Sequence, residues 1–440
     1  MRVAIVGTGI SGLVCAHLLH RHHDIQVFEA NGHVGGHTNT IEFDLDGRDY
    51  AVDTGFVVYN EANYPYFRRL LRQLGVATQP SPMSFGVSNA RSGVAWRGTN
   101  LDTVFAQRRN VLRPSFHRML RDIMRFNRAA KRLVHADFTD PYLTLGEFTA
   151  ELGVSRRFLV DFLVPFGAAV WSADPRSFLE FPAATYTRFM ANHSLLDVGH
   201  TSNWRTVSGG SKRYVEKLIA PFADHIHLRT PVGKVVRRPD GVELMTADGP
   251  QHFDRAVLAT HSDQALRLLG DAHASEREIL GALRYQPNTA TLHTDEKILP
   301  RVRRARASWN YHVGPEPDGA ATVTYWMNEL QAIASPHQFL VTLNRPDEID
   351  RSRVIAEFDY SHPVFDTAAI RAQTRRQEIQ GMGGVFFAGA YWGYGFHEDG
   401  VRSALDVCRY FGVDLDSSEM AFTHDVSDDH PIDISGPVSR

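Results

Sequence analysis

Cysteine is almost absent from this chain: only Cys15 and Cys408 occur in 440 residues. Both fall in predicted helices, so nothing points to a disulfide framework, and we expect two buried thiols in a cytoplasmic protein. The first predicted strand begins at residue 2, and we expect no signal peptide. The chain also lacks any run of the ~18 apolar residues that a membrane span needs.

A strong charge of one sign is also lacking, since the net charge is only −3. With 43% hydrophobic and 22% charged residues, the composition is that of a soluble chain long enough for two domains, with no sign of a nucleic-acid partner. A P-loop, a GxSxG elbow and a CxxC pair are absent. His20, His22 and His23 crowd the end of the first predicted helix without a nearby cysteine, so we expect no metal site.

The opening of the chain carries the clearest motif. A buried strand at residues 2–6 runs directly into Gly7-x-Gly9-x-x-Gly12, a helix follows at 11–20, and a strand at 25–28 ends on Glu29. The first glycine permits a tight turn, the second lets a pyrophosphate approach the backbone, and the third lets the helix pack on the strand. The carboxylate can accept hydrogen bonds from a ribose. This order predicts a dinucleotide-binding unit.

A second glycine pair distinguishes between the dinucleotides. Gly35-Gly36-His37-Thr38 comes shortly after Glu29, and Asp53-Thr54-Gly55-Phe56 follows a strand-like stretch. A simple NAD site does not need a second close backbone approach, although a plain glycine turn remains an alternative. An extended cofactor with a ribityl chain and a flavin does need one.

On these motifs the chain resembles the FAD-dependent flavin amine oxidoreductase superfamily, which includes amine oxidases, protoporphyrinogen oxidase and carotenoid desaturases. His37 stands where most members carry arginine, so we expect another group to supply charge to the pyrophosphate. Neither cysteine falls where the superfamily attaches flavin covalently. The resemblance therefore implies non-covalent FAD.

The segment from Phe387 to Val401, FAGAYWGYGFHEDGV, extends the resemblance. It implies that the strand ending near Gly389 meets the ribityl and phosphate part of FAD, and that a helix starting near Gly400–Val401 points at the flavin. With SWNY at 308–311, TYWMN at 324–328 and GGSKRY at 209–214, the chain is similar to a narrower branch of predicted NAD/FAD-binding proteins. That branch is associated with cyclopropane-fatty-acid-synthase-like methyltransferases, which implies a lipid substrate and a possible methyltransferase partner.

The fold class implied is α/β, with a Rossmann-like, GR2-type FAD domain built from three segments and an α+β substrate domain. We assign residues 1–76, 205–283 and 384–413 to the FAD domain, with strands expected at 226–228, 232–236, 242–246 and 256–259. Residues 77–204 and 284–383 form the substrate domain. The acidic tail, 414–440, is expected to be loosely ordered.

The residues expected to contact FAD follow from the motifs and from the resemblance. They are Gly7, Gly9, Ser11, Gly12, Glu29, Ala30, Gly35, Gly36, His37, Thr38, Gly55, Phe56, Val232, Gly389, Gly400 and Val401, with the Val232 backbone at the adenine. His397 and Tyr394 are expected to lie closest to the flavin and are the candidate catalytic residues. For His397 a structural hydrogen bond is the alternative to a substrate-orienting role.

The function implied is that of an FAD-dependent oxidoreductase using hydride transfer at flavin N5 on a hydrophobic substrate, most simply a fatty acyl chain. No second GxGxxG unit is present, which favours an oxidase or a desaturase over a reductase with its own NAD(P)H domain. An amine oxidase is one alternative. A flavin-binding scaffold subunit for a lipid methyltransferase is an alternative of another class.

A regular series of arginines bears on partners. Apolar residues recur with helical period between 116 and 133, and arginines lie on the other side at 118, 121, 125, 128 and 132, with only Asp122 opposing. A solvated helix face explains this pattern. Docking of Arg118, Arg121, Arg125, Arg128 and Arg132 on anionic lipid headgroups or on an acidic partner explains it as well, which would make the protein peripheral at a membrane.

Overall fold

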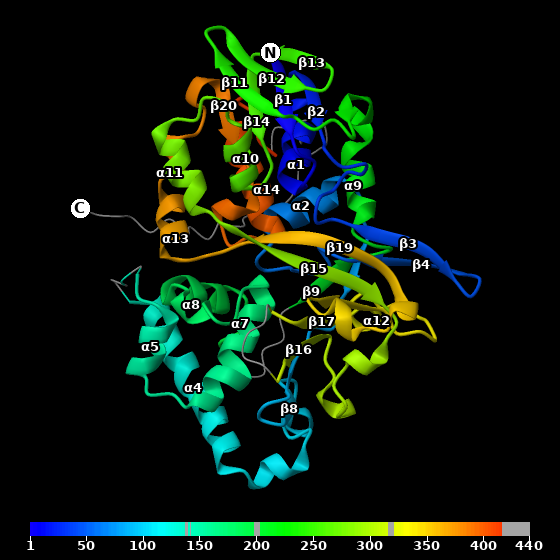
Figure 1. The fold of residues 1–440 in the computed structure, drawn as a ribbon, viewed down its shortest axis with the longest axis vertical. Coiled ribbons are helices and arrows are strands. Elements are labelled where there is room, and N and C mark those ends of the chain that lie inside the picture. The colour runs from blue at the N-terminus through cyan, green and yellow to red at the C-terminus, as the bar shows by residue number, and fades with distance from the viewer. Residues whose placement is uncertain (137–139, 141, 198–202, 316–320, 416–440) are drawn as a thin grey trace, which may run out of the picture.

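The computed structural model describes residues 1–136, 140, 142–197, 203–315 and 321–415. Two large sheets organise the molecule (Figure 1): a five-stranded sheet in the upper half and a seven-stranded sheet below it. Apart from its first two residues, the acidic tail lies outside the described residues. No described helix has the length and apolar character needed to cross a membrane.

The five-stranded sheet is parallel throughout and has the order β10-β2-β1-β14-β20. Its strands come from three distant parts of the sequence: β1 (Arg2–Val6), β2 (Asp24–Phe28), β10 (Ile226–His227), β14 (Arg255–Leu258) and β20 (Val385–Phe387). The central strand is almost wholly apolar because both faces of a parallel sheet are covered. Val3 and Ile5 face one core, whereas Ala4 and Val6 face another.

Helices cover one face of this sheet, and a mixed layer covers the other. The first face carries α1 (Ile10–Leu19), α2 (Pro65–Gln73), α9 (Lys212–Ile219) and α14 (His397–Arg409). The second carries β11 (Lys234–Arg238), β12 (Gly241–Thr246), β13 (Gly249–Phe253), α10 (Ser262–Leu268), α11 (Ala274–Ala282) and α13 (Thr367–Thr374). The strand expected at 232–236 begins two residues later, so Val232 precedes it.

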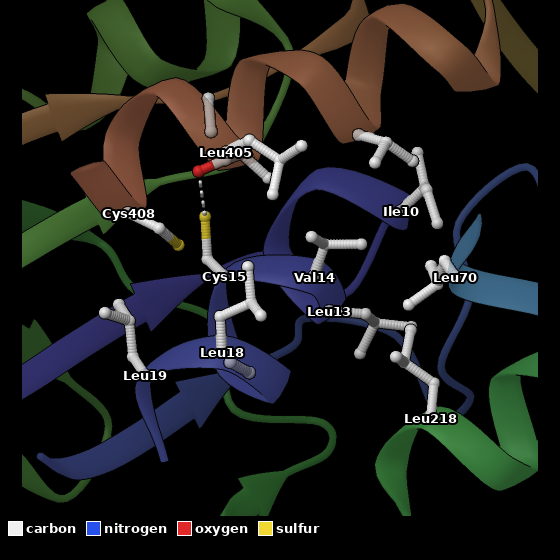
Figure 2. Close-up of a cluster of buried hydrophobic side chains, with 14 of the residues drawn as sticks. Ile10, Leu13, Val14, Cys15, Leu18, Leu19, Leu70, Leu218, Leu405 and Cys408 are labelled. Atoms are coloured by element: carbon white, nitrogen blue, oxygen red, sulfur yellow. Dashed lines mark hydrogen bonds between the residues drawn. The ribbon is translucent and has the colours of Figure 1, made fainter. Parts of the chain in front are cut away.

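The two cysteines lie where α1 packs against α14 (Figure 2). Every residue of α1 is buried, which is why its sequence is apolar on all sides. Cys15 and Cys408 are both fully buried and unbridged, and the Cys15 Sγ lies 3.8 Å from the Ala404 carbonyl oxygen. The prediction of two buried helical thiols is confirmed.

The seven-stranded sheet has the order β19-β15-β18-β17-β16-β7-β8 and is antiparallel except between β16 and β7. The strands are β7 (Phe85–Asn89), β8 (Val94–Arg97), β15 (Tyr285–His293), β16 (Trp309–Val313), β17 (Val323–Trp326), β18 (Leu340–Leu343) and β19 (Val354–Pro363). Smaller elements flank it: β3 (Thr40–Leu45), β4 (Arg48–Asp53), β5 (Tyr59–Asn60), β6 (Thr78–Pro80), β9 (Trp204–Val207) and α12 (Met327–Leu330).

A helical layer packs against the β7, β8, β16 and β17 end of this sheet and forms the lower left of Figure 1. It comprises α3 (Leu101–Val104), the 3-10 helix η1 (Arg108–Leu112), α4 (Pro114–Val134), α5 (Leu145–Glu151), α6 (Arg156–Phe158), α7 (Val164–Trp171) and α8 (Ala183–Asn192). The division into FAD and substrate domains at the residue numbers given above stays a prediction.

Candidate functional site

The turn between β1 and α1 requires two of its three glycines for internal reasons. Gly7 has φ +103°, and a Cβ there would lie 2.8 Å from the Ala259 carbonyl oxygen. A Cβ on Gly12 would collide with the carbonyl oxygen of Gly7. The fold itself therefore demands glycine at both positions, for turn geometry and for packing of the helix on the strand.

Gly9 is different, because nothing in the protein requires a glycine there. Its backbone is extended, with φ −66° and ψ 174°, and an added Cβ would meet no atom within 4 Å. The glycine of the second turn, Gly36, approaches so closely that its Cβ would lie 3.1 Å from the Gly9 Cα. A bare backbone beside an open approach fits a pyrophosphate, so the residues present suit an extended dinucleotide.

Two helix N-termini meet beside this turn. The Ser11 hydroxyl donates to the Gly400 carbonyl oxygen at 3.0 Å, and a Cβ on Gly400 would lie 2.6 Å from Ile10 Cγ2. The first-turn N–H groups of a helix have no partner within the helix, and the helix dipole favours negative charge there. The starts of α1 and α14 therefore form one region suited to phosphate and to an electron-rich flavin.

Helix α14 begins at His397, and the expectation of a start near Gly400–Val401 was wrong. The Asp399 carboxylate explains the earlier start, since it accepts hydrogen bonds from the main-chain N–H groups of Tyr394 and Phe396, both at 3.0 Å. Acidic residues in a first turn stabilise a helix N-terminus, and the Glu398-Asp399 pair was a readable signal of it. His397 thus lies in the first turn of the helix.

Glu29 is placed at the tip of β2 and is tied to the glycine turn. One of its carboxylate oxygens accepts from the N–H and the hydroxyl of Thr8, and the other accepts from the N–H and the side-chain amide of Asn31. A ribose diol would replace the two side-chain donors and leave the two main-chain bonds in place. Sequence reasoning missed Thr8 and Asn31, although both flank the expected ribose site.

The main chain of Val232 is available for a ligand. Within the described residues it takes part in no hydrogen bond, although neighbouring main-chain groups are paired: Thr230 N–H donates to the Glu29 carbonyl oxygen, and Gly233 N–H to that of Met245. An adenine edge offers both a donor and an acceptor to such a backbone. The position fits the adenine contact that the resemblance implies.

His37 lies in a cluster of three imidazoles. Its ring stacks on Tyr360 at 4.8 Å and lies 5.2 Å from the ring of His362 and 6.2 Å from that of His261. His37 Nε2 is buried without a hydrogen-bond partner, and burial holds the pKa of this imidazole well below its usual range. Burial also lowers the pKa of His261, and that of His362 to about 4. The described residues contain no group of three or more His, Cys, Asp or Glu able to hold a metal ion.

His397 is buried against the segments at residues 35–38 and 53–56. Its Nε2 lies 3.0 Å from Thr38 Oγ1 and 3.0 Å from the Tyr214 hydroxyl, which are 2.5 Å from each other. The ring stacks on Phe56 with centroids 3.6 Å apart. Burial lowers the pKa of His397 to about 3, so the imidazole is neutral at physiological pH. Sequence reasoning did not anticipate Tyr214.

Tyr394 points elsewhere, toward the helical layer. Its ring lies 5.8 Å from Phe189 of α8, and its carbonyl oxygen accepts from the Trp171 indole at 3.1 Å. Phe396 stacks on Phe189 at 5.3 Å and lies 6.3 Å from Trp171. The two candidate catalytic side chains therefore lie on different sides of the loop before α14. We call Trp171, Phe189, Tyr394 and Phe396 the aromatic cluster.

The remaining predicted contacts lie around the same region. Gly55 fits only because it has no side chain, since its Cβ would collide with the His37 carbonyl oxygen. Gly35 has φ +116°, and Gly389 N–H donates to Ser403 of α14 at 2.9 Å. Val401 is buried in the α1–α14 core. Ala30 directly follows Glu29 and is exposed beyond the tip of β2, and its contact with FAD stays a prediction.

Asp53 links the end of β4 to the start of α9, a role that sequence reasoning missed. Its carboxylate accepts from Thr40, from the N–H and hydroxyl of Ser211, and from Gln331. Burial raises the pKa of Asp53 to about 6. Its place at the end of β4, two residues before Gly55, was the available signal.

Comparisons with known proteins agree with this geometry. The family model described as flavin containing amine oxidoreductase matches residues 10–410. No curated protein sequence is significantly similar to the chain. Among solved structures, a CLA-producing fatty acid isomerase from P. acnes superposes with TM-score 0.66 at 18% identity, covering 93% of this chain and 98% of the isomerase.

Two further structures have the same fold. Cyclohexylamine oxidase from Brevibacterium oxydans IH-35A superposes with TM-score 0.66 at 17% identity, covering 93% of this chain and 99% of the oxidase. A protein described as a putative protoporphyrinogen oxidase from Exiguobacterium sp. 255-15 superposes with TM-score 0.65 at 17% identity, covering 93% and 98% respectively.

Proposed function

Because the chain belongs to the flavin-containing amine oxidoreductase family, we propose that its substrate is a fatty acyl chain carrying a free carboxylate. The chain is an FAD-dependent oxidoreductase with the amine-oxidase fold. Bound FAD supplies a two-electron carrier that exchanges hydride at N5. The protein's own task is to hold the cofactor, to place the substrate and to exclude water.

The residues available for FAD follow from the geometry above. Glu29 would hold the ribose, the Val232 main chain would hold the adenine, and the bare backbone of Gly9 at the start of α1 would face the pyrophosphate. The N-terminus of α14 would favour the electron-rich pyrimidine edge. His397 keeps Thr38 and Tyr214 in place at that end, and its direct contact with substrate stays a prediction.

The aromatic cluster is the observation that supports an apolar substrate. Its four rings lie around the loop that leads into α14, and the residues packed behind them in the same core are hydrophobic. Apolar and aromatic walls are typical of sites that bind hydrophobic ligands. A fatty acyl chain would lie against such rings without leaving a polar group unpaired.

Charge near the aromatic cluster favours an acid over an amine. Burial, together with the Asp399 carboxylate, raises the pKa of Tyr394 to about 12, and Arg188 and Arg402 act in the opposite direction. Arg188 is exposed on α8 and makes no ion pair within the described residues. The carboxylates at the start of α14, Glu398 and Asp399, are occupied by main-chain N–H groups. Arg402 is paired with Asp399 at 3.9 Å, so Arg188 is the cation left to attract a substrate carboxylate and to repel an ammonium group.

A relative of the same fold is named for chemistry on such a substrate, the fatty acid isomerase from P. acnes. The amine alternative has support of the same kind from cyclohexylamine oxidase. Identity of 18% or less to either protein leaves the choice to the local side chains, which favour the acid.

The test uses the FAD-loaded protein, long-chain unsaturated and saturated fatty acids, and a matched set of alkyl amines. We expect anaerobic flavin bleaching, or a shifted or new double bond detected by mass spectrometry, with the acids only. Arg188→Gln should raise the half-saturating acid concentration roughly tenfold, as expected when a charge-assisted hydrogen bond is lost. Arg48→Gln, an exposed arginine on β4, is the control. Bleaching by amines alone would refute the proposal.

A further inference from the structure

The exposed face of α4 is a row of unpaired arginines. Arg118, Arg121, Arg125, Arg128 and Arg132 are all exposed, and at 100° per residue they fall within an arc of roughly 80° along ~21 Å of helix. None of the five side chains forms an ion pair or a hydrogen bond with another described residue. We call these five residues the arginine row.

Nothing on the helix opposes this charge. Asp122, the one acid in this stretch, points inward, is buried, and accepts a hydrogen bond from the Ser155 N–H at 2.8 Å. The expectation that it opposes the arginines was wrong, because the turn before α6 uses it instead. The other face of α4 is buried through Phe116, Met119 and Phe126. The helix therefore has one face fixed in the protein and one cationic face in solvent.

Exposed aliphatic side chains lie next to the start of the arginine row. Leu112 is 86% exposed and Val111 48% exposed, both in η1, which leads directly into α4. Leu101, at the start of α3, is 77% exposed. A side-chain ion pair from Arg108 to Asp102 links η1 to α3, so these residues belong to one end of the molecule. We call Leu101, Val111 and Leu112 the apolar tip.

More arginine surrounds the apolar tip. Arg108 and Arg109 are exposed beside Val111 and Leu112, and Arg304 reaches Asp102 at 3.6 Å. Asp102 is thus flanked by two arginines and adds no net negative charge to this end. In Figure 1 the start of α4 lies at the bottom of the molecule, at the end opposite the N-terminus and β11–β13. Access to this end is not limited by the rest of the fold.

We infer that the apolar tip and the arginine row dock on an anionic lipid bilayer. Arginines beside exposed aliphatic residues match an interface in which headgroups carry the negative charge and the acyl region takes the apolar side chains. A nucleic acid or an acidic polypeptide would be attracted by the arginines but offers no apolar region to cover the largely exposed Leu101 and Leu112. Because the inner face of α4 is buried in the protein core, the contact is peripheral. This inference does not rest on the proposed substrate.

The test is co-sedimentation of the FAD-loaded protein with vesicles of phosphatidylcholine mixed with phosphatidylglycerol, and with phosphatidylcholine alone. We expect binding to the mixed vesicles only, weakened by added salt. The triple variant Arg121→Gln/Arg125→Gln/Arg128→Gln should bind roughly 100-fold more weakly, at about fivefold per arginine. The triple variant Arg21→Gln/Arg48→Gln/Arg72→Gln removes the same charge from exposed positions outside α3, η1 and α4 and should bind as wild type.

A second variant separates lipid from other polyanions. Leu101→Ser/Leu112→Ser should lose most vesicle binding at high salt while its weak binding to soluble polyglutamate is unchanged. Flavin absorbance should be the same in all variants, which shows that they fold. Wild-type binding to mixed vesicles by the arginine variant would overturn the inference. So would vesicle binding insensitive to the leucine changes, or tighter binding to polyglutamate or an oligonucleotide than to vesicles.

Discussion

Two of the four hydrogen bonds on Glu29, those from the side chains of Thr8 and Asn31, are the ones that a ribose must displace. Glu29→Ala should weaken FAD binding roughly tenfold or more, because charge-assisted bonds to the sugar are lost. Thr8→Val removes only the competing hydroxyl donor and should leave FAD affinity equal or slightly higher. Flavin fluorescence on titration of the apoprotein measures both dissociation constants. An unchanged value for Glu29→Ala would place the ribose elsewhere.

The unpaired nitrogen of His37 leads to a prediction about protons. Burial depresses the pKa of this imidazole, and a bound diphosphate favours its charged form, so FAD binding should take up a proton. Affinity should therefore rise as the pH falls. His261, His362 and His397 also face this ring, with Tyr360 stacked on it and Asp263 near His261. Calorimetry in two buffers of different ionisation enthalpy measures the uptake.

His37→Arg supplies the contrasting case. A permanent charge at the pyrophosphate should tighten FAD binding by roughly tenfold and should abolish most of the proton uptake. His225→Arg, a histidine beyond the end of α9, should change neither quantity. Equal affinity and equal uptake in His37→Arg and wild type would show that His37 does not meet the phosphates.

His397 distinguishes substrate chemistry from cofactor placement. If it orients substrate, His397→Ala should retain FAD while flavin reduction slows by the 10²–10⁴-fold that a positioned acid–base group typically contributes. If its role is to hold Thr38 and Tyr214, the variant should lose flavin or thermal stability instead. Anaerobic reduction per bound FAD is the measurement, and Tyr214→Phe is the companion variant. A wild-type rate per flavin would end the catalytic interpretation.

At the level of elements, the start of α14 depends on one carboxylate. Asp399→Ala removes two hydrogen bonds from partly buried main-chain N–H groups and should lower the free energy of unfolding by about 2 kcal/mol, the upper end for loss of a helix cap. Asp399→Asn keeps one acceptor and should cost less. Chemical denaturation measures both values. If Asp399→Ala unfolds at the wild-type denaturant concentration, α14 is held only by its packing on α1.

The elements that sequence predicted well are those with strong local signals. Only a few residues of sequence determine the local geometry of each of these: the apolar strand β1, the glycine turn and the acidic end of β2. The predicted start of α14 was wrong because it was placed at Gly400, whereas the acidic residues Glu398 and Asp399 mark a first turn that begins at His397. The imidazole cluster could not be predicted at all, since His37, His261 and His362 come together only when two sheets meet. Tyr214 and His397 come together because α9 and α14 pack on the same face of the five-stranded sheet, which neither local sequence states.

For the whole molecule, buried neutral histidines should make the folded state less stable at acid pH. Burial lowers the pKa of six of them to about 4 or below: His17, His193, His293, His312, His362 and His397. Below about pH 6.5 the unfolded chain protonates these groups and the folded chain does not, so stability falls as pH falls. Burial raises the pKa of Asp53 to about 6 and that of Glu398 to about 7, which acts in the opposite sense.

Between about pH 4.5 and 6 the unfolded chain binds about four more protons at these eight groups than the folded protein does. The thermal midpoint of the FAD-loaded protein should therefore drop steeply from pH 7 to 5. His293→Gln changes a fully buried site remote from the glycine turns. It should reduce the difference in bound protons between the unfolded and folded states by about one, and so make the thermal midpoint less dependent on pH. A midpoint that stays level over this range would contradict the assigned burial of these imidazoles.

The order of the parallel sheet also constrains how the protein can be made. Strand β1 is synthesised well before β14 at residues 255–258, with which it pairs, and β14 pairs in turn with β20 at 385–387. Helix α1 finds its main partner in α14, which ends only at Arg409. At ~5–20 residues per second, roughly 20–80 s pass between the synthesis of α1 and that of α14, and α1 lacks its main partner during this time. Cofactor capture must then be among the last events of biogenesis, and a ribosome stalled before residue 385 would carry a nascent chain with no competent flavin site.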